Sequence, residues 1–277
     1  MTAHTMEFGP RLVATPTGRL QSLILVRPNV NIERAAPLAG EPGSICARAR
    51  EQHAVLQTTL AYFGVETIVF ESHATDPYEC CAANPALAFG DGVLVMRPTQ
   101  MSRRAEADRM QSELARLEIP LAGHIAGPGM LDGNDVILAG TTAFIGVGSR
   151  GNQIGRAGFA QLARAYGYRT VEVQLAPDVP ALRCVAAAVA ADTIVIGADK
   201  ADPGAFQGFR TIVLERGEEM AAGVLCLDER HVVADVRYRT ALSQMHRAGI
   251  TVESIDLYDF AKIGVTPSML ALVLKRD

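Results

Sequence analysis

Short apolar runs alternate along the chain with amphipathic stretches, and this alternation predicts strands and helices in a recurring order. The run 20–28 (LQSLILVRP) is typical of a buried strand. It is followed by 45–64, where apolar residues recur at helical spacing until Gly64, and then by the strand-like run 65–71. The chain is therefore expected to open with a strand, a helix and a second strand.

Hairpins are predicted at several places further along, each from two apolar runs that flank a short polar or glycine-containing turn. Their ranges are 85–98 (with Gly90, Asp91 and Gly92 at the turn), 135–147, 182–197 and 224–236. Helices are predicted over 102–118 (with Ser102 as its N-cap), 154–167 and 238–249. Further strands are predicted over 169–175, 251–257 and 268–275.

A hairpin–helix–strand module thus recurs about every 45 to 60 residues, which indicates an internally repeated architecture. The repeats share the pattern of elements and not the residues themselves. Such modules cannot bury a sheet face alone, so they are expected to pack around a shared centre. We therefore predict an α/β fold in a single domain that spans residues 1–277.

The composition is that of a soluble globular protein, because 49% of the residues are hydrophobic and 20% are charged. Aromatic residues make up 5% and tryptophan is absent, which argues against an aromatic-lined reader of nucleic acid. The formal net charge is −4, so no basic field attracts the chain to nucleic acid or to an anionic membrane. Neither partner is expected.

The five cysteines are expected to be buried thiols in a reduced, cytoplasmic protein. No basic n-region is followed by an apolar h-region, and no run of 18 apolar residues occurs, so neither secretion nor a membrane-spanning segment is expected. Cys80 and Cys81 are adjacent, and in an extended segment their side chains would point in opposite directions. No set of cysteines and histidines has the spacing of metal ligands, so neither a metal nor another cofactor is predicted.

The stretch 130–155 (MLDGNDVILAGTTAFIGVGSRGNQIG) places aspartates, an arginine and an asparagine around a predicted hairpin. It resembles the central segment of the dimethylarginine dimethylaminohydrolases and related arginine-modifying enzymes of the pentein superfamily. Their pattern there is an acidic residue, two glycines, an aspartate, a hairpin, and then serine, arginine and asparagine. Blocks at 25–28, 50–71, 93–110 and 257–264 also resemble the family, so the resemblance covers nearly the whole chain.

The resemblance implies a five-bladed α/β propeller of ββαβ modules around a narrow central pocket, in agreement with the repeated pattern. In such enzymes a cysteine near the C-terminus attacks a guanidinium or amidine carbon. A histidine at the start of the third module's hairpin is the acid/base, and carboxylates grip the guanidinium nitrogens. An arginine often holds the α-carboxylate of the substrate.

Part of this machinery is retained in the sequence. Asp132 stands at the family's acidic position, where it orients the histidine or contacts substrate, although an aspartate before Gly133 could also merely form a turn. Arg150 matches the family arginine, and a guanidinium can bind a carboxylate through two parallel hydrogen bonds. Asn152 follows at the matching spacing. Asp135 is expected to serve the turn.

The covalent machinery of the family is absent at the matching positions. Met269, preceded by Ser268, stands where the nucleophilic cysteine is expected, and a thioether cannot form a thiolate. The family histidine falls at or next to Ala181. At the acidic clamp the chain has Ala83 and Asn84, and Asn84 can form hydrogen bonds but cannot neutralise a guanidinium.

Other residues could replace the missing groups. Cys184 lies close to the lost histidine, Cys80 and Cys81 lie beside the altered clamp, and His124 precedes the central motif. Each also has a simpler interpretation, because a cysteine in a strand is usually a small core residue and a lone histidine is usually solvated. We predict Asp132, His124 and Cys184 as catalytic residues. The predicted substrate-binding residues are Cys81, Asn84, Arg150, Asn152, Ser268 and Met269.

The function predicted from these residues is binding of a small amino-acid-like carboxylate, with altered C–N chemistry that does not use the Cys-His pair. One alternative is a catalytically lapsed protein that binds a ligand or regulates. Another is a guanidino-group hydrolase or amidinotransferase that uses a relocated cysteine. A protein that acts only through its surface is a further alternative. The expected partner is a small molecule, and a homodimer is compatible with the sequence.

Overall fold

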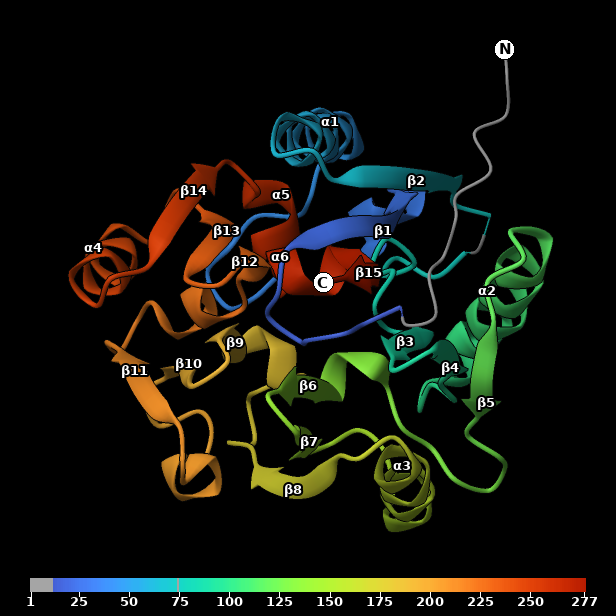
Figure 1. The fold of residues 1–277 in the computed structure, drawn as a ribbon. Helices are drawn as coiled ribbons and strands as arrows, with labels where there is room; N and C mark the ends of the chain where they lie inside the picture. Colours follow the sequence, from blue (N-terminus) through green and yellow to red (C-terminus); the bar gives the residue numbers. More distant parts are fainter. Residues whose placement is uncertain (1–11, 74) are drawn as a thin grey trace.

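Five small sheets are arranged around a common centre (Figure 1). The computed structural model describes residues 12–73 and 75–277. Within these residues each sheet has three strands: two that pair antiparallel and a third that pairs parallel with the middle one. The predicted α/β architecture of repeated modules around a shared centre is confirmed.

The strands occupy equivalent places in the five sheets. The inner strands, nearest the centre, are β3 (Ala86–Phe89), β6 (Val136–Ala139), β9 (Ala186–Ala190), β12 (Leu225–Asp228) and β15 (Ala271–Arg276). The middle strands are β1 (Leu20–Arg27), β4 (Gly92–Val95), β7 (Thr142–Val147), β10 (Thr193–Gly197) and β13 (His231–Asp235). The outer strands are β2 (Glu66–Glu71), β5 (Leu121–His124), β8 (Arg169–Gln174), β11 (Arg210–Leu214) and β14 (Thr251–Ile255).

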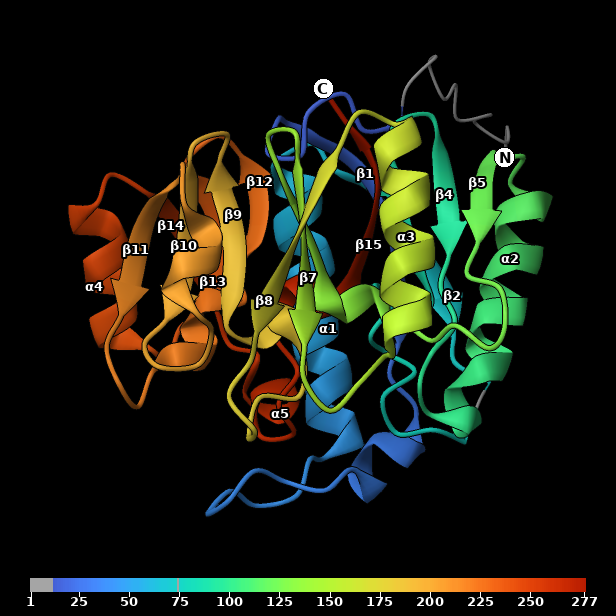
Figure 2. The same cartoon turned by 90° about the horizontal axis from the view of Figure 1, so that it is seen from below.

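The long helices lie on the outside of the ring of sheets (Figures 1 and 2). They are α1 (Cys46–Tyr62), α2 (Arg104–Arg116), α3 (Gln153–Ala165) and α4 (Arg239–Arg247). Each of them connects the middle strand of its sheet to the outer one, which gives four ββαβ modules. In the β9–β10–β11 sheet the 3-10 helix η5 (Pro203–Phe206) takes this place. None of the helices in the described part of the chain is both long and apolar enough to cross a membrane.

One sheet joins the two ends of the chain and so closes the ring. Strand β15 pairs antiparallel with β1, with Leu23 opposite Val273 and Ile24 opposite Leu272. Strand β2 pairs with β1 on the other side, in parallel. The C-terminal strand is thereby fixed beside the N-terminal one, and the loop before it is held at the centre.

Two strands, one helix cap and the start of the last strand differ from the sequence predictions. Strands β5 and β11 were not predicted, because β5 is a four-residue segment without an apolar alternation and β11 pairs only through its neighbour β10. Ser102 is not the N-cap of α2: it lies within the 3-10 helix η2 (Met101–Arg103), and its hydroxyl donates to Asp76 at 2.7 Å. The first three residues of the last predicted strand, 268–270, lie in the short helix α6 (Pro267–Leu270).

The centre of the molecule is filled by small and apolar side chains. Strand β9 has the sequence AAAVA, and all five of its residues are buried. Small side chains on an inner strand allow neighbouring sheets to approach one another closely. The largest buried cluster joins residues of α1, β6, β9 and α6 around this centre, so the loops at the ends of the inner strands are placed on a rigid frame.

Candidate functional site

Most of the site residues predicted from the sequence lie in loops at one end of the ring. Because the first two strands of each sheet are antiparallel, the loop entering the first and the loop leaving the second meet at the same end. Segments 80–85, 130–135 and 181–185 enter inner strands in this way, and 148–152 leaves a middle strand. We call Cys81, Asp132, Asp135, Arg150, Cys184 and Met269 the hub cluster.

Asp132 and Arg150 form an ion pair at the edge of the hub cluster. The Asp132 carboxylate is buried, and its Oδ1 accepts a hydrogen bond from the backbone N–H of Thr99 at 2.7 Å. Its Oδ2 lies 3.6 Å from Nη1 of Arg150, whose side chain is 18% exposed. This separation is too long for a strong charge-assisted hydrogen bond. The arginine is therefore oriented by Asp132 while its guanidinium still has donors to offer.

Asp135 is a buried carboxyl with one unpartnered oxygen. It ends the 3-10 helix η3 (Gly133–Asp135), and its Oδ1 accepts the backbone N–H of Leu182 at 3.0 Å. Its Oδ2 has no hydrogen-bond partner among the described residues. Burial raises the pKa of Asp135 from 3.8 to about 7, and the nearby negative charge of Asp132 adds to the rise. A carboxyl that titrates near neutrality can serve as an acid or a base.

Asn84 and Asn134 form a second set of buried polar groups. The Nδ2 of Asn134 donates to Oδ1 of Asn84 at 3.0 Å, and both side chains are fully buried. Within the described residues, Nδ2 of Asn84 and Oδ1 of Asn134 lack hydrogen-bond partners. Buried polar atoms without partners are uncommon in folded proteins, and each one calls for an explanation such as a bound water, an ion or a ligand. One donor and one acceptor are thus available beside Asp135.

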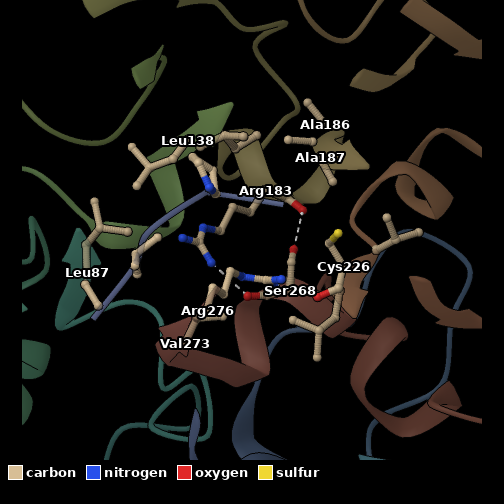
Figure 3. A pocket seen from close by; sticks show the side chains of 16 residues that line it. Leu87, Leu138, Arg183, Ala186, Ala187, Cys226, Ser268, Val273 and Arg276 are labelled. Atoms are coloured by element: carbon tan, nitrogen blue, oxygen red, sulfur yellow. Dashed lines mark hydrogen bonds between the residues drawn. The ribbon is translucent and has the colours of Figure 1, made fainter. Parts of the chain in front are cut away.

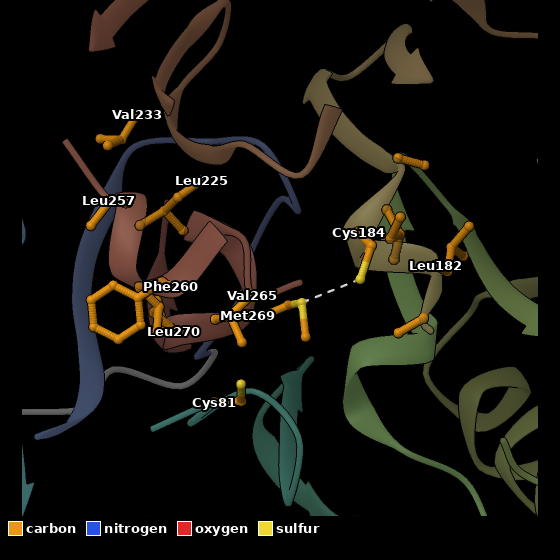
Figure 4. Packing of buried hydrophobic residues seen from close by; sticks show 14 of the residues in the cluster. Cys81, Leu182, Cys184, Leu225, Val233, Leu257, Phe260, Val265, Met269 and Leu270 are labelled. Carbon is orange, nitrogen blue, oxygen red and sulfur yellow. Dashed lines mark hydrogen bonds between the residues drawn. The ribbon is translucent and has the colours of Figure 1, made fainter. Parts of the chain in front are cut away.

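Three sulfur-containing side chains, those of Cys81, Cys184 and Met269, lie at the centre of the hub cluster (Figure 4). The thiol of Cys184 lies 3.6 Å from the sulfur of Met269 and donates to the carbonyl of Gly264 at 3.5 Å. Burial raises the pKa of Cys184 to about 12. Because the thiolate is the reactive form, Cys184 is a poor nucleophile at neutral pH.

The expectation that just one of Cys80 and Cys81 faces the pocket stays a prediction, because burial alone does not distinguish them. Both lie in a turn and not in a strand, so the alternation of an extended chain does not apply, and both are buried. Their side chains hydrogen-bond to each other, which raises the pKa of Cys80 and lowers that of Cys81. The positive charges of Arg103 and Arg150 further lower the pKa of Cys81. Cys81 is therefore the most acidic thiol of the hub cluster.

The remaining predicted site residues are not brought into the hub cluster. His124 is exposed at the end of the outer strand β5. Asn152 is the N-cap of α3: its Oδ1 accepts from the N–H groups of Gly155 and Met130 at 2.8 and 3.0 Å. The hydroxyl of Ser268 donates to the carbonyl of Arg183 at 3.3 Å. Asn152 and Ser268 thus hold loops in place, and their predicted contacts with a substrate stay predictions.

Two important residues were missed at the sequence level. Asp135 was expected only to serve a turn, although the apolar residues that follow it indicated a buried position. Arg103, which is 1% exposed, lay in a predicted helix without any sign that it would be buried. No group of histidine, cysteine and acidic side chains in residues 12–73 and 75–277 has the arrangement of a metal site.

Comparisons with known proteins connect this arrangement to enzymes that act on arginine derivatives. No protein-family model matches the chain. A dimethylarginine dimethylaminohydrolase from Pseudomonas aeruginosa is 23% identical over 226 residues, which cover 82% of this chain and 88% of the relative. One from Streptomyces coelicolor is 33% identical over 128 residues, which cover 45% and 48%.

Solved structures show the same fold. The Pseudomonas aeruginosa enzyme in complex with citrulline superimposes with a TM-score of 0.83 at 21% identity, covering 92% of this chain and 99% of that one. An amidinotransferase from Microseira wollei superimposes with a TM-score of 0.78 at 15% identity, covering 96% and 97%. At these identities the structures establish a shared fold and leave the chemistry of this chain open.

Proposed function

We propose a function for this chain as a member of the pentein superfamily, related to the dimethylarginine dimethylaminohydrolases. From this premise we infer that it binds a small amino-acid-like carboxylate at the hub cluster. We further propose that it carries out C–N chemistry with Asp135 as the acid/base. The observation that carries the proposal is the position of the buried Asp135 carboxyl within electrostatic range of Arg150.

Binding of the carboxylate is assigned to Arg150. Its only ion pair among the described residues is the 3.6 Å contact with Asp132, which leaves the guanidinium able to bind an anion in a bidentate manner. The buried amide nitrogen of Asn84 would donate a further hydrogen bond to the same ligand. The related Pseudomonas aeruginosa structure, which contains citrulline, supports a ligand of this size and class.

Proton transfer is assigned to Asp135, and covalent catalysis by the hub sulfurs is not part of the proposal. A general acid or base works best when its pKa is near the working pH, and burial brings Asp135 into that range. Met269 has no ionisable group, and Cys184 is held as a neutral thiol by burial. Asp135 is therefore a hub group whose protonation state changes near neutral pH.

Replacement of Arg150 by glutamine is expected to weaken binding of L-citrulline or L-ornithine about 100-fold, as for the loss of two charge-assisted hydrogen bonds. Arg150→Lys keeps the charge but not the planar fork, so an intermediate loss of about tenfold is expected. Isothermal titration calorimetry with both amino acids measures these changes. Arg156→Gln is the matched control, because Arg156 is also partly buried and is paired with Glu172 outside the hub cluster.

Equal affinity of the wild type and Arg150→Gln would remove Arg150 from the binding site. Failure of the wild type to bind either amino acid, while it still binds a protein partner, would favour the alternative of a protein that acts through its surface. Both outcomes are readable because Arg150 is partly exposed and pairs only loosely, so its replacement should leave the fold intact.

A second candidate function uses Cys81 as a relocated nucleophile, and it is favoured by the lowered pKa of that thiol. Under the main proposal, turnover of an amino-acid substrate should persist in Cys81→Ser. Release of citrulline from L-arginine or dimethylarginine is the assay for the second candidate. The cysteine mechanism would be established instead if Cys81→Ser lost citrulline release but kept its affinity for the ligand. Cys46→Ser is the control and should remain fully active.

A further inference from the structure

A cavity lies on the axis of the ring, among the inner strands (Figure 3). Its volume is about 90 Å³, and residues of all five inner strands line it. Arg183, from the 3-10 helix η4 (Leu182–Cys184), and Ser268, from α6, also line it. The residues that follow them, Cys184 and Met269, belong to the hub cluster. We call this space the axial cavity.

Two arginines line the axial cavity: Arg276 is buried and Arg183 is half-buried. Arg183 donates from Nε to the carbonyl of Val136 and from Nη1 to that of Ser268, both at 3.0 Å. Arg276 donates to the carbonyls of Gly18 and Cys226 at 2.7 and 2.5 Å. A guanidinium has five N–H donors, so each arginine keeps donors beyond these contacts.

No acidic side chain among the described residues lines the axial cavity, and neither arginine forms an ion pair with a described residue. Burial lowers the pKa of Arg276, and the negative charges of Asp228 and Glu229, which lie outside the lining, oppose this only in part. Burial and the positive charge of Arg276 lower the pKa of Arg183 to about 10, so the two charges oppose each other. Buried charges are normally paired, because an unpaired one is costly to remove from water.

We propose that the axial cavity binds a small carboxylate with a short aliphatic chain, its head group between Arg183 and Arg276. The rest of the lining is apolar and comes mainly from alanine, valine and leucine side chains, which suits a hydrocarbon chain. A volume of about 90 Å³ has room for roughly six water-sized groups, the number of heavy atoms in butyrate. The site does not depend on the function proposed for the hub cluster.

Sodium butyrate, exchanged against sodium chloride at constant ionic strength, is expected to raise the melting temperature in a saturable manner, because it binds the folded state. Acetate should act more weakly, since it lacks the chain, and n-butylammonium should have no effect. Arg183→Gln and Arg276→Gln should each raise the Kd for butyrate by about tenfold or more. Arg230→Gln, at a surface ion pair, is the control and should match the wild type.

Leu138→Glu tests the same site if the arginine variants do not fold. Leu138 lines the axial cavity and is half-buried, so a glutamate there can place a carboxylate next to the arginines. The butyrate response should then disappear without a loss of thermal stability. Val213→Glu, at an exposed position on β11, is its control and should respond as the wild type does.

Arg150→Gln separates the axial cavity from the hub cluster and should keep the full butyrate response. The proposal is overturned if butyrate does not stabilise the wild type more than chloride does. It is equally overturned if butyrate still stabilises Leu138→Glu. The same holds if Arg183→Gln and Arg276→Gln both fold and both keep the butyrate response. Loss of the response in Arg150→Gln would assign butyrate to the hub cluster instead.

Discussion

Asp135→Asn is expected to stabilise the folded protein at pH 8 by up to about 4 kcal/mol, the amount that corresponds to a rise in pKa from 3.8 to about 7. At this pH the wild type must carry a negative charge in a buried position. Asparagine removes the charge, and its Oδ1 can still accept the N–H of Leu182. Urea unfolding of both proteins at a series of pH values measures the difference.

The pH dependence has a definite sign. Between pH 3.8 and about 7 the folded state retains a proton on Asp135 that the unfolded state has already released. Stability contributed by this group is therefore lost as the pH rises through that window. The gain in Asp135→Asn should be small at about pH 4 and complete above about pH 7. A gain that does not change with pH would contradict the raised pKa.

Asp259→Asn is a matched control with the opposite expected sign. Asp259 is also fully buried, and its Oδ2 also lacks a partner among the described residues. Its Oδ1, however, lies 2.6 Å from Nζ of Lys262, which is itself buried. Asparagine at this position would leave the buried lysine without its counter-charge, so stability should fall. The contrast separates the loss of an unpaired charge from the loss of a paired one.

Activity distinguishes an enzyme from a protein that only binds ligand. If Asp135 is the acid/base, Asp135→Asn should lose turnover while the affinity for L-citrulline or L-ornithine remains, because Arg150 is unchanged. Stabilisation together with loss of activity is the pattern expected where a buried charge is retained for function. Gain of stability with unchanged turnover would remove Asp135 from the mechanism and leave it as an unfavourable buried charge.

Much of the fold could be predicted from the sequence, because the information lies in local periodicity. The hairpins that became β3–β4 and β12–β13 were visible as apolar runs around turns at Gly90 and Asp228. Strands β5 and β11 could not be predicted in this way. They are edge strands whose identity depends on pairing with β4 and β10, and pairing is not encoded in a local pattern.

The site could be predicted only in part. The resemblance to the pentein enzymes pointed to Asp132 and Arg150, and the structure places them 3.6 Å apart. The resemblance could not show that Asn152 would be the N-cap of α3, or that His124 would be exposed on an outer strand. The raised pKa of Asp135 depends on burial by loops distant in the sequence. Such an effect arises from the tertiary structure and not from spacing along the chain.

The largest loss of stability is expected from Glu106→Gln. Arg103 and Glu106 form a buried pair with three short hydrogen bonds, of which the shortest joins Nη2 and Oε2 at 2.7 Å. Burial acts to lower the pKa of Arg103. Glu106, together with the charges of Cys81 and Asp76, outweighs burial and raises that pKa. Burial also raises the pKa of Glu106, against the effect of Arg103, so it is the hydrogen-bond geometry that indicates a charged pair. The next carboxylate oxygen, on Asp76, lies 3.8 Å away. Without the negative charge of Glu106, the buried guanidinium of Arg103 is left with the more distant Asp76 carboxylate. The free energy of unfolding should therefore fall by about 3–5 kcal/mol.

Glu113→Gln is the control for this change, because Glu113 lies on the same helix and pairs with Arg116 at the same spacing and at the same distance of 2.7 Å. Arg116 and Glu113 are both exposed, so less than about 1 kcal/mol should be lost. Glu106→Gln also removes a negative charge that raises the pKa of Cys81. In the folded variant, thiol alkylation should therefore show a lower pKa for Cys81. A loss equal to that of the control, with no change in alkylation, would mean that solvent screens this pair despite its burial.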